Sequence, residues 1–332
     1  MFDQIGGLGR IVRNKTVAIK INLTGAPSYR LGHAPAELAH WTHPAVIGTV
    51  CNLMGRAGAR RIRLLESPWN TADPLEQYML EGGWEPSDLL GAAPRVEMEN
   101  TNYLGNAKTY SRFAVPGGGH MFRAFDLNHS YRDCDVFVSI AKLKEHATTG
   151  VTISMKNCFG ITPCTIYGEG APKDEPSLVP RGGRGPFHAG HRQPAASSPA
   201  ENDPTTPREG GYRVPRVVAD LVAARPIDLA IVDGIESMSG GEGPWIRNRL
   251  ARVSPGVLIV GTNPVNVDAV GTALMGFDPM ADRGIAPFEK CDSTLRLAEQ
   301  HGVGTRDLKR IEVVGGEISR LKFDMRKAPA SA

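Results

Sequence analysis

Short apolar runs that alternate with helical patterns constrain the fold of this chain most. The runs that predict strands are residues 16–23, 61–66, 135–140, 229–233 and 256–261. Apolar residues at helical spacing predict helices at residues 44–57, 150–159, 215–223, 264–275 and 292–301. This alternation predicts an α/β fold with a largely parallel sheet and helices on both of its faces. Another apolar run, residues 310–314, predicts a closing strand.

One long stretch does not follow this alternation. Residues 165–213 contain 8 glycines and 8 prolines, and their large aliphatic side chains are Ile166, Leu178 and Val179. This composition predicts a long inserted loop, and loops of this length are either functional or disordered. We therefore expect a single α/β domain over residues 1–332, interrupted by a lid-like or disordered insertion at 165–213.

Charge, hydropathy and cysteine content exclude several classes of protein. The net charge is only +3 and no block of lysines and arginines occurs, so we expect no nucleic-acid partner. The longest apolar runs have the length of strands, which predicts no membrane span. The five cysteines are widely spaced without a CxxC motif, as in reduced cytosolic proteins. We expect a cytoplasmic protein, and a homo-oligomer is compatible with the sequence.

Polar residues follow the first two predicted strands. Lys20 and Asn22 lie on the same side of the first strand, and Glu66 and Ser67 end the second. Ligands of parallel sheets bind beyond the carboxyl ends of the strands. These four residues are therefore candidates for substrate binding. The alternative is that Lys20 extends to solvent from a sheet edge.

The richest stretch for chemistry follows the third predicted strand. In an extended chain, Lys142, Lys144 and His146 point to one side, and Lys156 and Asn157 follow ten residues later. Clustered lysines lower one another's pKa, which suits proton transfer or the capture of an anion. We predict a site here, with Asn157 as a binding residue and the other four as catalytic. A solvated basic loop is the alternative.

Three further residues lie next to predicted helices or strands. His43 precedes Pro44 and is expected to cap a helix, where a neutral imidazole suits proton transfer. Asp233 ends a strand before a glycine-rich loop, and Asp268 lies near the start of a helix. Both carboxylates are candidates for substrate binding. For His43 and Asp268, a purely structural role is the alternative.

Motifs for common cofactors are absent from the sequence. There is no HExxH motif, no Gly-Lys-Ser/Thr ending of a P-loop and no GxGxxG after the first strand. We therefore predict no cofactor. A divalent metal remains an option if His43, His146, Glu66, Asp233 and Asp268 converge. An iron–sulfur cluster or a flavin is the other option.

Several short motifs occur together in order along the chain. They are Lys20-x-Asn22, Thr42-His43-Pro44, Glu66-Ser67-Pro68, Ala141-Lys-Leu-Lys-x-His146, Met155-Lys-Asn-x-Phe-Gly160, Asp233-Gly234, Gly243-Pro244 and Asn263-Pro-Val-Asn-Val-Asp268. This series resembles the family known as domain of unknown function 362, from about residue 15 to 315. Many members resemble iron–sulfur proteins because they carry a fused ferredoxin module, which this sequence lacks.

The residues favour one function over two others. The first hypothesis is an enzyme that acts on a small anionic organic substrate, a carboxylate or an acidic phenol. Lysine and histidine side chains would perform acid–base chemistry of the isomerase or lyase type. The second is an iron–sulfur or flavin redox protein, which the resemblance suggests and for which Cys158 and Cys164 are candidates. The third is a non-catalytic protein that binds an anion or a partner.

Overall fold

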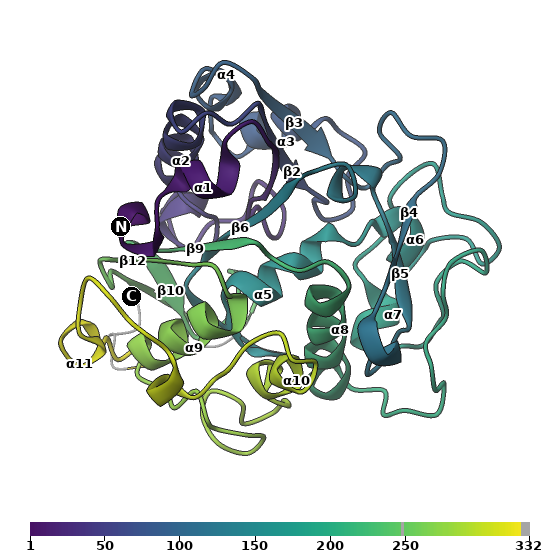
Figure 1. Ribbon diagram of the computed structural model, residues 1–332. Coiled ribbons are helices and arrows are strands. Elements are labelled where there is room, and N and C mark those ends of the chain that lie inside the picture. The colour runs from purple at the N-terminus through teal and green to yellow at the C-terminus, as the bar shows by residue number, and fades with distance from the viewer. Residues whose placement is uncertain (247–248, 327–332) are drawn as a thin grey trace.

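A six-stranded sheet forms the centre of the computed structural model, which describes residues 1–246 and 249–326 (Figure 1). The strand order is β12-β9-β6-β1-β2-β3. All neighbours are parallel except β12 and β9, which are antiparallel. The strands of this sheet are β1 (Thr16–Lys20), β2 (Arg61–Glu66), β3 (Val96–Asn100), β6 (Val136–Lys142), β9 (Leu229–Gly234) and β12 (Val257–Gly261).

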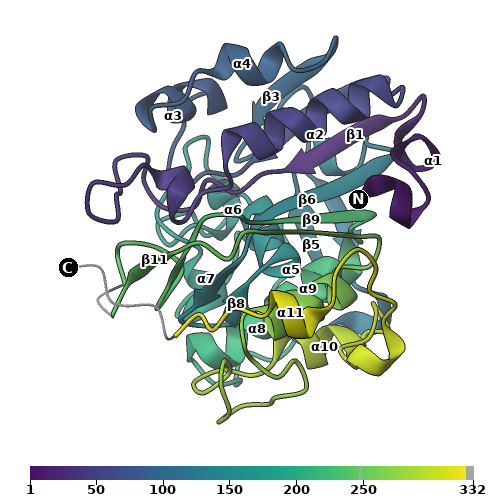
Figure 2. The same cartoon turned by 90° about the vertical axis from the view of Figure 1, so that its left-hand side faces the viewer.

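Helices cover both faces of the sheet (Figure 2). The helices are α1 (Leu8–Val12), α2 (Pro44–Arg56), α3 (Leu75–Glu81), α4 (Pro86–Leu90), α5 (Ser154–Asn157), α6 (Cys164–Tyr167), α7 (Gly185–His188), α8 (Gly210–Ala224), α9 (Pro264–Leu274), α10 (Thr294–Gln300) and α11 (Ile318–Leu321). Helices α1–α4 pack with one set of strand side chains, and α5, α8, α9 and α10 pack with the alternate set. The predicted α/β fold with a largely parallel sheet is confirmed.

Antiparallel hairpins flank the central sheet. Their strands are β4 (Ser111–Ala114) with β5 (Ala124–Leu127), β7 (Lys144–His146) with β8 (Gly150–Thr152), and β10 (Ser237–Ser239) with β11 (Ala251–Val253). The predicted helix 150–159 is therefore wrong at its start. Gly150 has a φ of 74°, which a helix does not allow, and its strand pairs with β7 before α5 begins.

The predicted closing strand at 310–314 is also wrong. Only a single helical turn at Leu308–Arg310 and irregular chain occur there. Val313 and Val314 are 40% and 46% exposed, and residues 310–314 pair with no strand in the described part of the chain. A β-branched run forms a strand only where it finds a partner.

The segment 165–213 packs on the rest of the chain. It includes α7 and the start of α8, and its Tyr167 and Phe187 side chains are fully buried in the core. The segment has few aliphatic residues, and these aromatic side chains anchor it instead. Whether the segment moves as a lid stays a prediction. The predicted single domain also includes residues 247–248 and 327–332, which lie outside the described residues.

Helix α2 shows how local sequence sets an element beside the sheet. His43 is its N-cap, as predicted, and Pro44 follows at the first helical position. Its apolar residues Ile47, Val50 and Met54 recur at helical spacing and are buried against the sheet.

Within the described part of the chain, no helix has both the length and the apolar character needed to cross a bilayer.

Candidate functional site

A cavity of about 80 Å³ lies beyond the carboxyl ends of β1 and β2. One water needs only ~10–15 Å³ by the same measure, so the cavity has room for a group of several atoms. We call it the lysine cavity. The titratable and charged side chains in its lining are Lys20, Glu66, Lys144, His146, Lys156, Arg184 and Glu242. The predicted Asn22, Ser67 and Asn157 also line it.

Lys20 and Glu66 form a buried ion pair at one wall of the cavity. The Lys20 ammonium lies 2.7 Å from Glu66 Oε1 and 2.8 Å from Oε2, and it also donates to Asn157 Oδ1 at 3.2 Å. The Asn157 amide in turn donates to the Lys20 carbonyl at 3.1 Å. Burial lowers the pKa of Lys20, and the Glu66 carboxylate opposes this effect. Asn157 and Glu66 therefore fix the Lys20 ammonium and offset its charge.

Gly160 lets the backbone approach this ion pair closely. A Cβ at this position would lie 2.7 Å from Glu66 Oε1 and 2.8 Å from the Lys20 ammonium. The Gly160 carbonyl also accepts a hydrogen bond from the Ser67 N–H at 3.1 Å. The glycine is thus required by the close contact with the two charged side chains.

Lys144 and Arg184 bring positive charge that neutral groups hold in place. The buried Lys144 ammonium donates to the carbonyl oxygens of His40 and Glu242, each at 2.8 Å. The Arg184 guanidinium donates to the carbonyl oxygens of Thr162 and Ser67 at 2.9 and 2.8 Å. Burial lowers the pKa of Lys144 well below its ordinary value, and the Glu242 carboxylate opposes this. An anion in the cavity would stabilise both cations.

Lys156 projects from the short helix α5 into the same cavity. Its ammonium lies 4.2 Å from the centre of the Phe159 ring, and it has no hydrogen-bond acceptor within residues 1–246 and 249–326. Burial lowers the pKa of Lys156 to about 7, partly offset by the Glu242 carboxylate and reinforced by Arg184. The amine and the ammonium therefore both exist near neutral pH, as a proton-transfer group requires.

His146 is held as a neutral imidazole beside Lys156. Its Nδ1 accepts a hydrogen bond from the Thr148 N–H at 3.1 Å and lies 3.7 Å from the Glu242 carboxylate. Burial lowers the pKa of His146 to about 3. Because Nδ1 accepts, the neutral ring carries its proton on Nε2. His146 is therefore suited to donate a hydrogen bond and not to act as the base.

Charges in the cavity do not balance. Four basic side chains, those of Lys20, Lys144, Lys156 and Arg184, face only two carboxylates, those of Glu66 and Glu242. Buried charges of one sign are costly unless they are paired. The arrangement therefore favours an anionic ligand. The available chemistry is proton transfer by Lys156, with hydrogen bonds and positive charge for a developing oxyanion.

Three predicted residues lie together outside this lining. The fully buried Lys142 ammonium lies 2.8 Å from Asp233 Oδ2. The same oxygen accepts the His43 N–H at 2.9 Å, and His43 Nδ1 accepts the Ala45 N–H as a helix cap. These contacts join β6, β9 and the start of α2. The Lys142 ammonium thus pairs with Asp233, whereas Lys144 lines the lysine cavity.

Asp268 and the cysteine candidates also lie outside the lining. The Asp268 carboxylate accepts the N–H groups of Ser154 and Met155 at 2.8 and 2.9 Å and so caps α5. Burial raises the pKa of Asp268 to about 7, with the Ser154 contacts opposing. Cys158 and Cys164 are buried, and burial raises the pKa of the Cys158 thiol to about 12.

The three carboxylates among the five residues considered for a divalent metal have separate partners. Glu66 pairs with Lys20, Asp233 with Lys142, and Asp268 with Ser154. In the described part of the chain, a group of three potential metal ligands occurs elsewhere, at His120, Asp220 and His301.

Comparison with known families agrees with the ordered motifs. The family model described as "Domain of unknown function (DUF362)" matches residues 17–273. The chain belongs to the DUF362 family. The matched region includes every residue of the lysine cavity named above. The resemblance stated from the motifs is thereby confirmed.

Two individual proteins are similar to this DUF362 chain. A thylakoid-associated protein of Synechocystis is 24% identical over 164 residues, which are 49% of this chain and 44% of that protein. The chain thus matches less than half of this relative's length. A crystal structure from Thermotoga maritima covers 77% of this chain and 56% of its own, with 12% identity and a TM-score of 0.32.

Sequence reasoning missed two charged residues of the cavity in this DUF362 chain. Arg184 belongs to the 165–213 segment, where no periodic pattern singles it out. Glu242 lies in residues 239–244, the glycine-rich loop that follows the strand of Asp233. The available signal was a charged residue within a stretch rich in glycine or proline. This signal is weak, because charged residues in such stretches usually face solvent.

Proposed function

We propose that this chain is an enzyme that moves a proton on a small organic anion, a carboxylate or an acidic phenol. The observation that supports this is the group of four basic side chains against two carboxylates in one small cavity. Lys144 and Arg184 hold only neutral hydrogen-bond partners, so they are placed to bind the anion.

Lys156 is the proposed base. Its neutral amine takes a proton from the carbon next to a carbonyl or carboxylate group. The electron pair of the broken C–H bond stays on the substrate as an enolate, and the proton moves to the Lys156 nitrogen. The Lys144 ammonium, the Arg184 guanidinium and the Nε2–H of His146 stabilise the enolate oxygen.

The same ammonium then returns the proton. Its return to a neighbouring carbon gives an isomerase, and its transfer to a leaving group gives a lyase. Arg184 belongs to the 165–213 segment and lines the cavity. We therefore propose that this segment closes over the bound anion. Such closure excludes water from the enolate.

Proton exchange with deuterated water tests this function without knowledge of the product. The full chain is incubated in D₂O with pyruvate and oxaloacetate, and NMR follows the loss of C–H signals beyond that in a sample without protein. We expect exchange for at least one acid. Lys156→Ala should slow the exchange by about 100-fold or more, the usual contribution of a general base.

The control variant is Lys309→Ala, which removes an exposed lysine and should leave exchange unchanged. Equal exchange by Lys156→Ala and the parent chain would overturn the assignment of the base. Tight binding of an acid by calorimetry without any exchange would instead support the non-catalytic alternative.

A further inference from the structure

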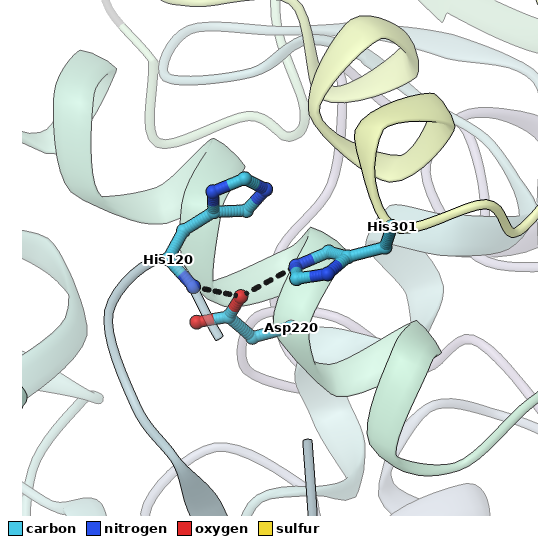
Figure 3. A group of neighbouring side chains, drawn as sticks. All are labelled: His120, Asp220 and His301. Carbon is cyan, nitrogen blue, oxygen red and sulfur yellow. Dashed lines mark hydrogen bonds and ion pairs between the residues drawn. The ribbon is translucent and has the colours of Figure 1, made fainter. Parts of the chain in front are cut away.

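Two histidines and an aspartate from three distant parts of the chain meet beside α8. Asp220 lies within α8, His301 ends α10, and His120 lies in the loop before β5. One potential ligand atom from each lies within 4.8 Å of the other two. Figure 3 shows two contacts meeting at one oxygen of the Asp220 carboxylate. None of the three residues lines the lysine cavity.

Backbone hydrogen bonds hold the Asp220 carboxylate in position. It is fully buried and accepts the N–H groups of His120, Met121 and Phe122 at 2.6, 2.7 and 3.0 Å. Its side chain therefore stays fixed whatever the histidines bind. Ligating carboxylates in metal sites are commonly held by such hydrogen bonds.

The His120 ring has the outer contact that is typical of a metal ligand. Its Nε2 lies 3.2 Å from the Leu297 carbonyl, which can only accept a hydrogen bond. The neutral ring that makes this bond keeps a bare nitrogen for a ligand.

His301 and Asp220 have a separation that suits two ligands of one ion. His301 Nε2 lies 2.9 Å from Asp220 Oδ1. In a tetrahedral site two ligand atoms, each ~2.1 Å from the ion, are ~3.4 Å apart, so these two side chains would separate by only about 0.5 Å to hold an ion. The ion would replace the proton between these two atoms, because a neutral imidazole can carry its proton on Nδ1 instead.

Both imidazoles are close to each other and partly open to solvent. The ring centres of His120 and His301 are 4.2 Å apart, and both residues are half-buried. Two protonated rings at this distance would repel each other, whereas two neutral rings can share a cation. Partial exposure also gives an ion a route of entry.

We propose that His120, Asp220 and His301 bind a divalent transition-metal ion such as Zn²⁺. Two imidazole nitrogens and one carboxylate oxygen are a donor set for such ions and not for Mg²⁺, which prefers oxygen ligands. Three protein ligands leave a coordination position for water or a further ligand. This site is independent of the function proposed for the lysine cavity.

Calorimetry with Zn²⁺ on the untagged, metal-free full chain tests the site. We expect one bound ion, and no heat of binding with Mg²⁺. His120→Ala and His301→Ala should each weaken Zn²⁺ binding by more than about 100-fold, because loss of even an outer partner costs 10–100-fold. His33→Ala and His191→Ala remove exposed histidines and should bind Zn²⁺ like the parent chain.

X-ray absorption on the Zn²⁺-loaded parent chain decides the case if a variant fails to fold. We expect nitrogen and oxygen neighbours at ~2.0–2.2 Å with imidazole scattering. A sulfur neighbour at ~2.3 Å would place the ion on cysteines and overturn the proposal. Unchanged Zn²⁺ affinity in folded His120→Ala and His301→Ala would also overturn it, leaving these residues a purely structural contact.

Discussion

The Lys20 ammonium and the Glu66 carboxylate are 2.7 Å apart, and both side chains are almost completely buried. The pair joins the carboxyl ends of β1 and β2 at the wall of the lysine cavity. Because Glu66 offsets the charge of Lys20, the other three basic side chains of the cavity, those of Lys144, Lys156 and Arg184, face the single carboxylate of Glu242. Lys20 therefore has a structural role in the proposed function, and anion binding is left to its neighbours.

Glu66→Gln should strongly destabilise the fold. Removal of one partner leaves the other charge buried, which costs about 3–5 kcal/mol in the free energy of unfolding. The matched control is Glu97→Gln, because Glu97 pairs with Arg61 at 2.6 Å while both side chains are exposed. This change should cost less than about 1 kcal/mol. Urea denaturation measures both, and equal losses would contradict the expected difference.

Gly160→Ala should disturb the same pair without changing a charge. Its Cβ would lie within 2.8 Å of both charged groups, and overpacking of this kind costs about 1–3 kcal/mol. Gly48→Ala is the control, because a Cβ there meets only Leu89 at 3.5 Å within a helix. That change should raise stability by about 0.5–1 kcal/mol. A Gly160→Ala protein as stable as the parent would show that the pair can shift freely.

The sequence was sufficient to predict the fold wherever local pattern and tertiary partners agree. Apolar runs predicted the parallel strands, whose carboxyl ends bring Lys20 and Glu66 to the cavity, and the stretch after β6 adds Lys144 from β7 and Lys156 from α5. The strand predicted for the β-branched run at 310–314 does not form, because this run pairs with no strand in the described part of the chain. Pattern alone carries no information about such partners.

The sequence pattern did not predict side-chain direction or the contacts of loops. The alternation of an extended chain puts Lys142 and Lys144 on one side, yet the Lys142 ammonium pairs with Asp233 while the Lys144 ammonium donates to two backbone carbonyls. Arg184 reaches the cavity because Tyr167 and Phe187 anchor its segment in the core. The cluster of His120, Asp220 and His301 spans three segments with no shared motif.

Arg184→Gln should weaken the binding of an organic acid to the lysine cavity. Charge-assisted hydrogen bonds contribute about 1.5–3 kcal/mol, so affinity should fall by about tenfold or more. Arg181→Gln changes an exposed arginine of the same segment and should leave affinity unchanged. Calorimetry with the acid that shows exchange compares them. Equal affinities for the two variants would mean that Arg184 only anchors its segment.

Lys156 should make the stability of the fold depend on pH. Its pKa is about 7 in the folded chain, against an ordinary value of 10.5. Between these values the unfolded chain binds more protons than the folded chain, so stability rises with pH across this window. Lys156→Met removes this group, and its stability relative to the parent should therefore fall from pH 7 to pH 10. Urea midpoints at these pH values measure the change. The control is Lys309→Met, which removes an exposed lysine; its stability relative to the parent should not change with pH. If the stability of Lys156→Met relative to the parent is also constant from pH 7 to pH 10, Lys156 keeps its ordinary pKa.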